Sequence, residues 1–443
     1  MSHPTSDGIG RPSRRRFLRG IGGFAALAAS LGASRGAAGA PRHGARPETG
    51  GAALEMQGPR ITVREVDAYP IYINQRSEGL LDPPVFDGDD DPRRWRWGGP
   101  FEQLPSAIIA VIKTDQGIVG FGMGAGGTAA VEIIRGHLRH LLIGTSPLDV
   151  EQRWDQMYSS GLLYGRRGLF PMALSAVDNA LWDIAGKYAE LPVTEMIGGW
   201  PRERLAIYQT GGNIPEALAR GVRNFKIGTP VGPHTPPDEQ RRVVDRVLAV
   251  RDMLDDAGVG ARLMIDCVSR NGTADWAVGY AQQLRPADLY FMEELLSPDD
   301  VFGYAELVRR IGGGGPGWTR VACGEHEYTE HGFNILVRNQ AAEVLQPDIT
   351  WCGGLTAGKR IRDLVEGAGL ELIPHRGGSV WGLPIALTAR TCTMAESFPA
   401  QSPILDAMSP PFDNGDYVAP TTPGFGSTLT EEMVLDARLP GTF

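Results

Sequence analysis

The sequence predicts an α/β protein in which a (β/α)8-type barrel follows an N-terminal α+β capping domain. Eight short apolar segments after residue 200 each end in a polar residue, and helical patterns of about ten to twenty residues separate them. From Asp266 onward the polar ends recur at intervals of 27, 32, 23, 27 and 31 residues. These intervals are close to the ~31 residues per unit of an eightfold barrel of ~250 residues. A doubly wound open sheet would also alternate strands and helices, but no glycine fingerprint follows the first strand.

Composition limits the classes of protein that fit. The chain has 443 residues, 42% of them hydrophobic, and a net charge of -9, which suits a barrel with a smaller domain and excludes a disordered chain. Without a basic excess, nucleic acid is not an expected partner. The cysteines form no C-x-x-C pair, so we expect buried free thiols rather than a zinc site or disulfides. They are Cys267, Cys323, Cys352 and Cys392.

Residues 1–40 read as an export signal. Arg14 and Arg15 precede a mildly apolar stretch at 21–31 that is too short to span a membrane, and the segment ends in the small-residue pattern Ala38-Gly39-Ala40. This arrangement resembles the twin-arginine signal of bacteria, which implies a periplasmic or secreted protein with no membrane anchor after processing. A basic nucleic-acid arm is the alternative, but it leaves the apolar stretch unexplained. Removal of residues 1–40 would leave a chain with a net charge of about -14. Residues 41–58 are expected to be a disordered lead-in.

The capping domain is expected over residues 59–200. Strand-like patterns at 61–73 and 106–122, the second with a turn at Asp115-Gln116-Gly117, predict a small antiparallel sheet, and residues 173–188 follow the spacing of an amphipathic helix. The long segment 74–103 has little periodicity and is expected to be a functional loop. Its arginines could reach the pocket mouth, or they could form a solvated run balanced by nearby aspartates. They are Arg76, Arg93, Arg94 and Arg96.

The barrel is expected over residues 201–407, and 408–443 should return to the capping domain. Because the carboxyl ends of barrel strands meet at one face, the polar residues that end them should converge. The eight expected strand ends are Gln209, Lys226, Asp266, Glu293, Glu325, Asp348, His375 and Asp406.

Three consecutive strand ends are acidic. Asp266, Glu293 and Glu325 would repel one another unless a cation lay among them. An all-oxygen ligand set favours Mg²⁺ over zinc. The alternative is that each acid merely caps the helix that follows it.

The next two strand ends, Asp348 and His375, are expected to form an acid/base dyad. A carboxylate bonded to one imidazole nitrogen fixes the tautomer of the ring and raises its basicity, which leaves the other nitrogen to move a proton. A histidine that only satisfies a polar position is the simpler alternative.

These residues carry a resemblance to the mandelate racemase branch of the enolase superfamily, over about residues 60 to 430. The resemblance implies that Asp266, Glu293 and Glu325 bind Mg²⁺ and that Asp348 and His375 form the catalytic dyad. It also covers Ala180-Leu181-Trp182-Asp183 and Gly198-Gly199. It places Asp406 where the family usually has a glutamate that donates a hydrogen bond to the enolate oxygen.

Strand two departs from the common pattern of the branch. The chain has Phe225-Lys226-Ile227-Gly228 where Lys-x-Lys is usual, and in this respect it resembles the rhamnonate dehydratases. Lys226 is retained as a site residue. The loop histidine of that subgroup has no counterpart in 74–103, so the substrate is expected to differ.

The expected function is Mg²⁺-dependent α-proton abstraction followed by dehydration of an acid sugar, in a homo-oligomeric lyase. A dehydratase needs one base, whereas a racemase needs a second on the opposite face. Two alternatives remain open. One is a racemase, epimerase or cycloisomerase that uses Lys226 or a loop arginine, and the other is a non-catalytic carboxylate-binding protein.

Overall fold

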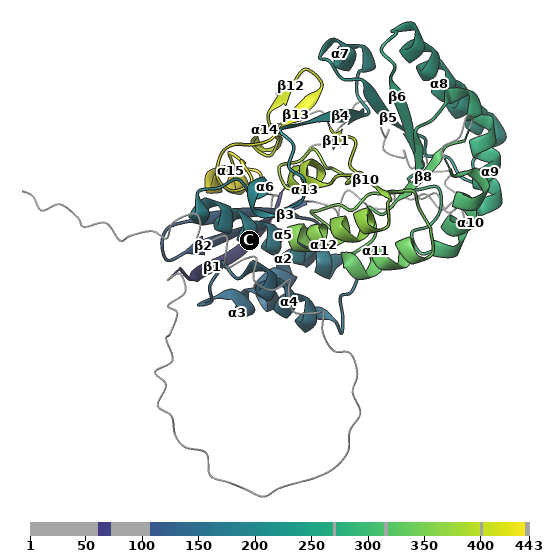
Figure 1. Cartoon of the computed structure of the whole chain (residues 1–443). Helices are drawn as coiled ribbons and strands as arrows, with labels where there is room; N and C mark the ends of the chain where they lie inside the picture. The colour runs from purple at the N-terminus through teal and green to yellow at the C-terminus, as the bar shows by residue number, and fades with distance from the viewer. Residues whose placement is uncertain (1–60, 72–106, 269–271, 314–317, 399–401, 439–443) are drawn as a thin grey trace, which may run out of the picture. The chain divides into compact units, whose positions relative to one another are not determined.

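The computed structural model describes residues 61–71, 107–268, 272–313, 318–398 and 402–438 (Figure 1). The predicted signal at 1–40, the lead-in at 41–58 and the loop at 74–103 with Arg76, Arg93, Arg94 and Arg96 lie outside these ranges. Within the ranges, every helix is too short or too polar to cross a membrane. The four cysteines are free and buried, as expected.

The predicted antiparallel sheet is present near the start of the described chain. It runs in the order β1 (Val63–Ile71), β2 (Ala107–Thr114) and β3 (Val119–Gly124). The turn between β2 and β3 contains Gly117 at φ 76°, and the Ile118 N–H donates to the Thr114 hydroxyl at 3.0 Å. The turn predicted from Asp115-Gln116-Gly117 is confirmed.

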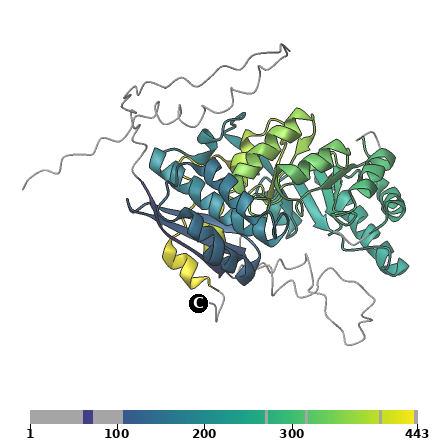
Figure 2. The same ribbon diagram turned by 90° about the horizontal axis from the view of Figure 1, so that it is seen from below.

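Helix α5 (Leu169–Ala189) packs directly on β3 (Figure 2). Gly120, Gly122 and Gly124 alternate along the strand, and a Cβ on any of them would collide with a carbonyl oxygen of α5. Side chains at these three positions would therefore push the helix off the sheet. The predicted helix at 173–188 lies within α5. The other helical segments before the barrel are α2 (Gly127–Ile133), the π-helix η1 (Ile134–Leu138), α3 (Arg139–Leu142), α4 (Val150–Gly161) and α6 (Val193–Met196).

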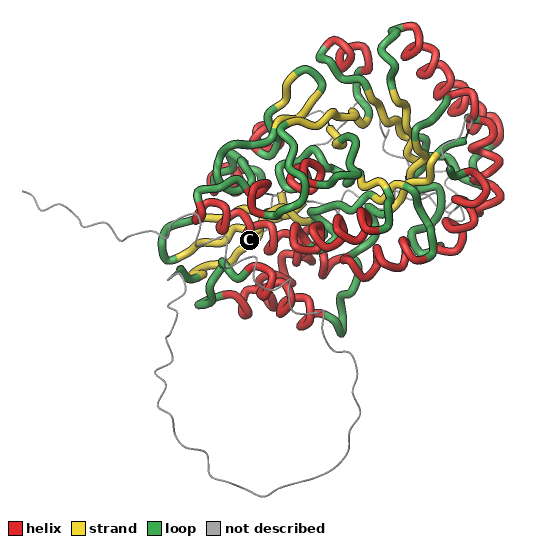
Figure 3. Tube along the Cα trace, viewed as in Figure 1, coloured by secondary structure: helices red, strands yellow, loops and turns green. Residues whose placement is uncertain are grey.

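Eight parallel strands follow, and helices alternate with them and lie along their outer side (Figure 3). The strands are β4 (Arg204–Thr210), β5 (Asn224–Gly228), β6 (Arg262–Asp266), β7 (Phe291–Glu293), β8 (Arg320–Cys323), β9 (Val344–Leu345), β10 (Glu371–Leu372) and β11 (Ala395–Ser397). The helices are α7 (Ile214–Ala219), α8 (Pro237–Asp256), α9 (Ala274–Gln283) with the 3-10 turn η2 (Arg285–Ala287), α10 (Val301–Ile311), α11 (Thr329–Arg338), α12 (Gly354–Gly367), α13 (Leu383–Thr388) and α14 (Pro403–Ala407).

Each strand pairs with its neighbour along the chain from β4 to β10, and β11 pairs with β4. Between β10 and β11 the link is made by single contacts. The Gly378 N–H donates to the Glu396 carbonyl at 2.8 Å, and at the other end the Thr393 hydroxyl donates to Glu371 at 2.6 Å. A buried apolar layer fills the interior, which makes the barrel a packed core as expected of the fold. It consists of Tyr208, Met264, Phe291, Ala322, Val344, Ile373 and Met394.

The eighth strand is not where the sequence pattern placed it. Strand β11 ends at Ser397, whereas Asp406 lies in helix α14 and is exposed. The apolar run Pro403-Ile404-Leu405 looks like a strand, but Pro403 is the first residue of the helix, a position that its fixed φ suits. The prediction that Asp406 ends the eighth strand is therefore wrong.

The C-terminal segment contacts both parts of the chain. The hairpin β12 (Phe412–Asp413) and β13 (Asp416–Val418) adds to β4 through an antiparallel pairing. Helix α15 (Glu431–Asp436) contacts β1, and Glu431 accepts a hydrogen bond from Lys113 of β2 at 2.6 Å.

Helix α5 also caps helix α12 of the barrel. Asp178 accepts hydrogen bonds from the backbone N–H of Thr356 at 2.8 Å and from its hydroxyl at 2.7 Å. About one turn earlier, Ser175 accepts from the Gly353 N–H at 2.9 Å, and Asn179, the residue after Asp178, accepts from the Leu355 N–H at 3.1 Å. The first turn of a helix has no partners for its N–H groups within the helix. A single face of α5 supplies them here.

We expect Asp178→Ala to lower the free energy of unfolding by about 1–3 kcal/mol, because two buried donors of Thr356 lose their acceptor. Urea denaturation followed by circular dichroism measures this. Asp252→Ala on the exposed face of α8 is the matched control, with an expected change within about 0.5 kcal/mol. Equal midpoints for the two variants would contradict the capping role.

Candidate active site

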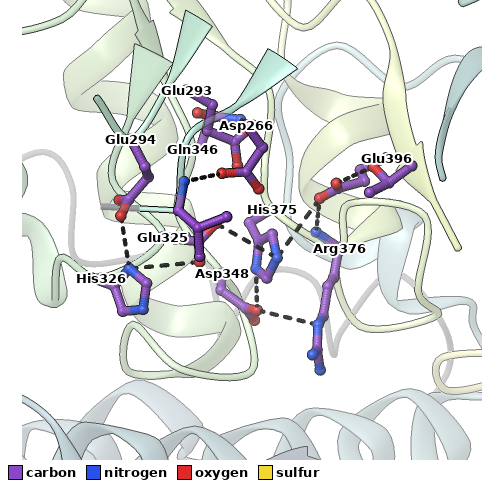
Figure 4. Close-up of polar contacts among 12 residues, drawn as sticks. Asp266, Glu293, Glu294, Glu325, His326, Gln346, Asp348, His375, Arg376 and Glu396 are labelled. Atoms are coloured by element: carbon purple, nitrogen blue, oxygen red, sulfur yellow. Dashed lines mark hydrogen bonds and ion pairs between the residues drawn. The ribbon is translucent and has the colours of Figure 1, made fainter. Parts of the chain in front are cut away.

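Three acidic side chains meet at the carboxyl ends of β6, β7 and β8 (Figure 4). Asp266 and Glu293 are in register on neighbouring strands, and Glu325 follows β8 after Gly324, whose φ is 126°. Each offers an oxygen, and these oxygens lie within 4.8 Å of one another. The structure therefore brings together all three predicted metal ligands.

The ammonium group of Lys226 lies against this cluster from β5. Its Nζ is 2.7 Å from Glu293 Oε2, 2.7 Å from Glu396 Oε1 and 3.8 Å from Asp266 Oδ2, and the side chain is 1% exposed. Burial lowers the pKa of Lys226, but Glu293 and Glu396 outweigh it and hold the pKa well above its usual value. Lys226 is therefore a fixed positive charge.

One ammonium does not balance these carboxylates. Burial raises the pKa of Asp266 to about 6 and raises that of Glu293 well above its usual range. Glu325 is different: burial opposes its ionisation, but His375, His326 and Lys226 hold its pKa at about 2. The buried Oε1 of Gln346 has no hydrogen-bond partner among the described residues, although its amide donates to Glu293 at 2.8 Å. The surplus of negative charge and the all-oxygen donor set fit Mg²⁺.

The predicted dyad is formed. His375 Nδ1 is 2.8 Å from Asp348 Oδ2, and the other oxygen of Asp348 accepts from the Thr350 N–H at 2.7 Å and its hydroxyl at 2.6 Å. His375 Nε2 faces the acidic cluster, 3.7 Å from Glu325 and 3.9 Å from Glu396. Burial lowers the pKa of His375, but Glu325, Glu396 and Asp348 raise it above its usual value. The ring is thus oriented with one nitrogen toward the cluster.

Glu396 is a site residue that sequence reasoning missed. It lies on β11 and is buried. It accepts a hydrogen bond from the Thr210 hydroxyl at 2.5 Å and forms an ion pair with Lys226. Asp406 is exposed on α14 and takes no part in the cluster. A glutamate is therefore present on the eighth strand, where the resemblance placed Asp406. Its sequence signal is the acidic residue within the short segment Met394-Ala395-Glu396-Ser397.

His326 is a second residue that was not predicted as functional. Its Nδ1 lies 3.1 Å from Glu294 and 3.5 Å from Glu325, and its ring lies 5.8 Å from that of Trp351. Burial lowers the pKa of His326, but Glu294 and Glu325 raise it to about 9. His326 thus adds positive charge beside the three carboxylates.

The position where the second lysine of strand two is usual has no side chain. Gly228 ends β5 and pairs in register with Asp266. Strand β5 therefore contributes the side chain of Lys226 to the cluster, and Gly228 contributes no side chain. The face opposite His375 receives no base from this position.

Comparison with protein families agrees with this geometry. Residues 102–198 match the N-terminal domain of mandelate racemase and muconate lactonizing enzyme, and residues 213–433 match the enolase C-terminal domain-like family. The chain belongs to the mandelate racemase branch of the enolase superfamily. The fold class predicted from the sequence is confirmed.

The chain resembles proteins that are named for different reactions. An L-rhamnonate dehydratase of Saccharopolyspora erythraea is 33% identical over 337 residues, which cover 74% of this chain and 84% of that protein. The crystal structure of rhamnonate dehydratase from Gibberella zeae with Mg has a TM-score of 0.73 at 25% identity, and the match covers 86% of this chain and 96% of that one. A racemase from Streptomyces coelicolor A3(2) with bound magnesium has a TM-score of 0.70 at 26% identity, covering 85% and 100%.

We expect Asp266→Asn and Glu325→Gln each to weaken Mg²⁺ binding at least about tenfold, because each removes one anionic ligand from a three-carboxylate site. Isothermal titration calorimetry measures the affinity. Asp406→Asn is the matched control and should bind Mg²⁺ as the wild type does. Unchanged affinity in both ligand variants would place the metal elsewhere.

Proposed function

We propose that the protein is a Mg²⁺-dependent hydro-lyase that removes the α-proton of a sugar acid and eliminates water. The observation that carries this function is the His375–Asp348 dyad, whose free nitrogen faces the three-carboxylate site at the same barrel mouth. The 33% identity with an L-rhamnonate dehydratase supports the same reaction.

Asp266, Glu293 and Glu325 would hold the metal. Bound there, Mg²⁺ would supply positive charge that compensates the negative charge developing on the substrate carboxylate as the α-proton leaves. Lys226 adds a second positive charge beside the substrate carboxylate, and its ion pairs with Glu293 and Glu396 keep it in place.

His375 is the base in this function. In the neutral ring with Nδ1–H donating to Asp348, Nε2 is the nitrogen that accepts the α-proton, and it is directed at the cluster. Asp348 is itself held by two hydrogen bonds from Thr350, so the ring has one orientation. After it accepts the α-proton, the imidazolium can protonate a departing hydroxyl on the same face.

The arrangement of bases favours dehydration over racemisation. A racemase delivers a proton to the face opposite the first base, and Gly228 offers no side chain there. Lys226 is engaged with two carboxylates on the cluster side. One histidine is sufficient for elimination of water.

L-rhamnonate is the first substrate to test, because the S. erythraea relative is named for it. A panel of six-carbon aldonates and aldarates, with purified protein and Mg²⁺ in deuterated water, separates the reactions. Loss of water supports the proposal, exchange of the α-proton without loss of water indicates a racemase, and neither indicates a binding protein.

We expect His375→Asn to retain Mg²⁺ affinity and lose α-proton exchange by roughly 10²–10⁴-fold, the usual contribution of a positioned acid/base group. Asparagine can still donate to Asp348, so the fold should persist. Nuclear magnetic resonance follows the exchange, and calorimetry provides the metal control. Wild-type exchange in this variant would mean that another group is the base, with Lys226 the first to examine.

We further propose that the protein is exported through a twin-arginine signal in residues 1–40 and assembles as a homo-oligomer. The pair Arg14-Arg15 before an apolar stretch supports export. Exposed apolar side chains at Leu163 and Phe302 support self-association.

We expect the double change Arg14→Lys, Arg15→Lys to retain the protein in the cytoplasm, because the paired arginines are the feature that marks this route. Cell fractionation with an antibody to the protein measures its location. Wild-type protein in the same strain is the control. Export of the double variant at the wild-type level would indicate a different signal.

A further inference from the structure

Arg376 follows the dyad histidine and extends along Asp348 (Figure 4). In this view its guanidinium lies on the other side of His375 from Asp266 and Glu293. The proposed mechanism uses none of its nitrogen atoms. Its position beside the reacting residues therefore calls for a separate explanation.

One donor of the Arg376 guanidinium has no acceptor among the described residues. Its Nε is buried without a hydrogen-bond partner, and the nearest carboxylate oxygen, Asp348 Oδ2, is 4.0 Å away. That oxygen already accepts from His375, and Thr350 occupies the other one. Asp348 is thus satisfied without Arg376. A buried donor left unpaired is costly, which indicates that something else in this corner accepts its hydrogen bond.

Trp351 forms the wall of the same corner. The guanidinium carbon of Arg376 lies 5.3 Å from the centre of the Trp351 ring and 6.0 Å from that of Phe398. Trp351 is 8% exposed, and its indole Nε1 is also buried without a partner among the described residues. Its ring contacts that of His375 at 5.2 Å between centres. Two unpaired N–H donors therefore lie beside one side of the dyad.

The backbone at Arg376 has a strained conformation. Its φ is 52°, in the left-handed region that glycine favours, although Gly377 and Gly378 follow directly. The conformation is held by the Arg376 N–H, which donates to Glu396 Oε2 at 2.9 Å. An arginine at a position suited to glycine directs a long cationic side chain from the strand end toward Trp351 and Asp348.

We propose that Arg376 is a specificity-determining residue that, with the indole N–H of Trp351, binds an acceptor oxygen of the substrate beyond the carbons that react. This inference rests on the proposed dehydratase function. The metal ligands, Lys226 and His375 would contact the substrate carboxylate and the two carbons that react. Arg376 and Trp351 would contact the hydroxyl or carboxylate oxygens further along the substrate chain. A planar guanidinium with several donors suits such oxygens.

The test compares a full-length substrate with a truncated one. Glycerate keeps the carboxylate, the α-proton and the β-hydroxyl but lacks every more distant atom. The assay uses as substrate the six-carbon aldonate or aldarate that the wild type dehydrates fastest. Glycerate is added as a competing ligand, and its inhibition constant is measured. We expect Arg376→Met to lower kcat/KM for the six-carbon substrate by about 10–100-fold, the usual effect of losing a charged hydrogen bond. The inhibition constant of glycerate should change less than about twofold.

Two further variants complete the design. Trp351→Phe keeps the ring and removes only the N–H, so kcat/KM for the six-carbon substrate should fall by about 2–10-fold and glycerate inhibition should persist. Arg360→Met is the matched control. Its guanidinium also lies over a tryptophan, 4.5 Å from the ring of Trp154, but it pairs with Asp155 and Glu330 away from the dyad, and kcat/KM should be unchanged.

The outcomes are distinct. If Arg376→Met lowers kcat for the six-carbon substrate as much as it lowers kcat/KM, Arg376 positions the dyad and the inference is wrong. The inference is also wrong if the variant weakens glycerate binding as much as it weakens use of the six-carbon substrate. Unchanged kinetics with both compounds also overturn it. A wild-type protein that neither dehydrates nor exchanges any acid sugar would instead refute the proposed function. Thermal denaturation followed by circular dichroism confirms that the variants are folded.

Discussion

The barrel mouth depends on the buried ammonium group of Lys226. Its partners come from strands that are not its neighbours, Glu293 on β7 and Glu396 on β11, so the ion pairs tie together strands across the interior. Glu396 also joins β11 to the segment after β10 through the N–H groups of Arg376 and Gly378. At this junction the described strands share no ladder of hydrogen bonds. Closure of the barrel and assembly of the acidic cluster are therefore one feature.

A buried cation surrounded by several carboxylates sets a requirement for the rest of the site. Removing one partner would leave a buried charge without compensation, which is far more destabilising than losing a surface ion pair. The surplus of negative charge makes the same cluster a ligand for a divalent ion. The demands of stability and of metal binding thus converge on the same few side chains.

The dyad depends on the N-terminal part of the chain as well. Asp348 and Trp351 precede helix α12, whose first N–H groups are satisfied by Ser175, Asp178 and Asn179 of α5. Trp351 also packs with Ala125, which follows β3. A shift in the position of α5 would therefore also move the segment that orients His375.

The parts of the site that could be predicted are those that barrel topology alone determines. Asp266, Glu293, Glu325, Asp348 and His375 each end an apolar segment, and parallel strands bring such ends together. Glu396 was missed because β11 is only three residues long and carries an alanine and a serine instead of branched apolar residues, which leaves little pattern to detect. The spacing of the other units pointed to Asp406 instead.

The unpaired donors of Arg376 and Trp351 could not be predicted from the sequence, for a different physical reason. A hydrogen-bond donor without an acceptor is a property of the folded environment, and no local pattern records it. The same holds for His326, whose charge follows from the approach of Glu294. Sequence spacing predicts which residues converge, and only the packed structure shows which of their atoms remain unsatisfied.

The burial of all four cysteines has a consequence for redox chemistry. Burial raises the pKa of each thiol, to about 12 for Cys392, so the reactive thiolate is scarce at neutral pH. In an oxidising compartment an unfolded chain with four thiols could form mispaired disulfides, whereas the folded protein presents none to an oxidant. Export in the folded state would carry these thiols past the oxidising machinery without the need for a reductant. The packed core would then protect the thiols in the way that pairing in a disulfide framework protects those of many secreted proteins.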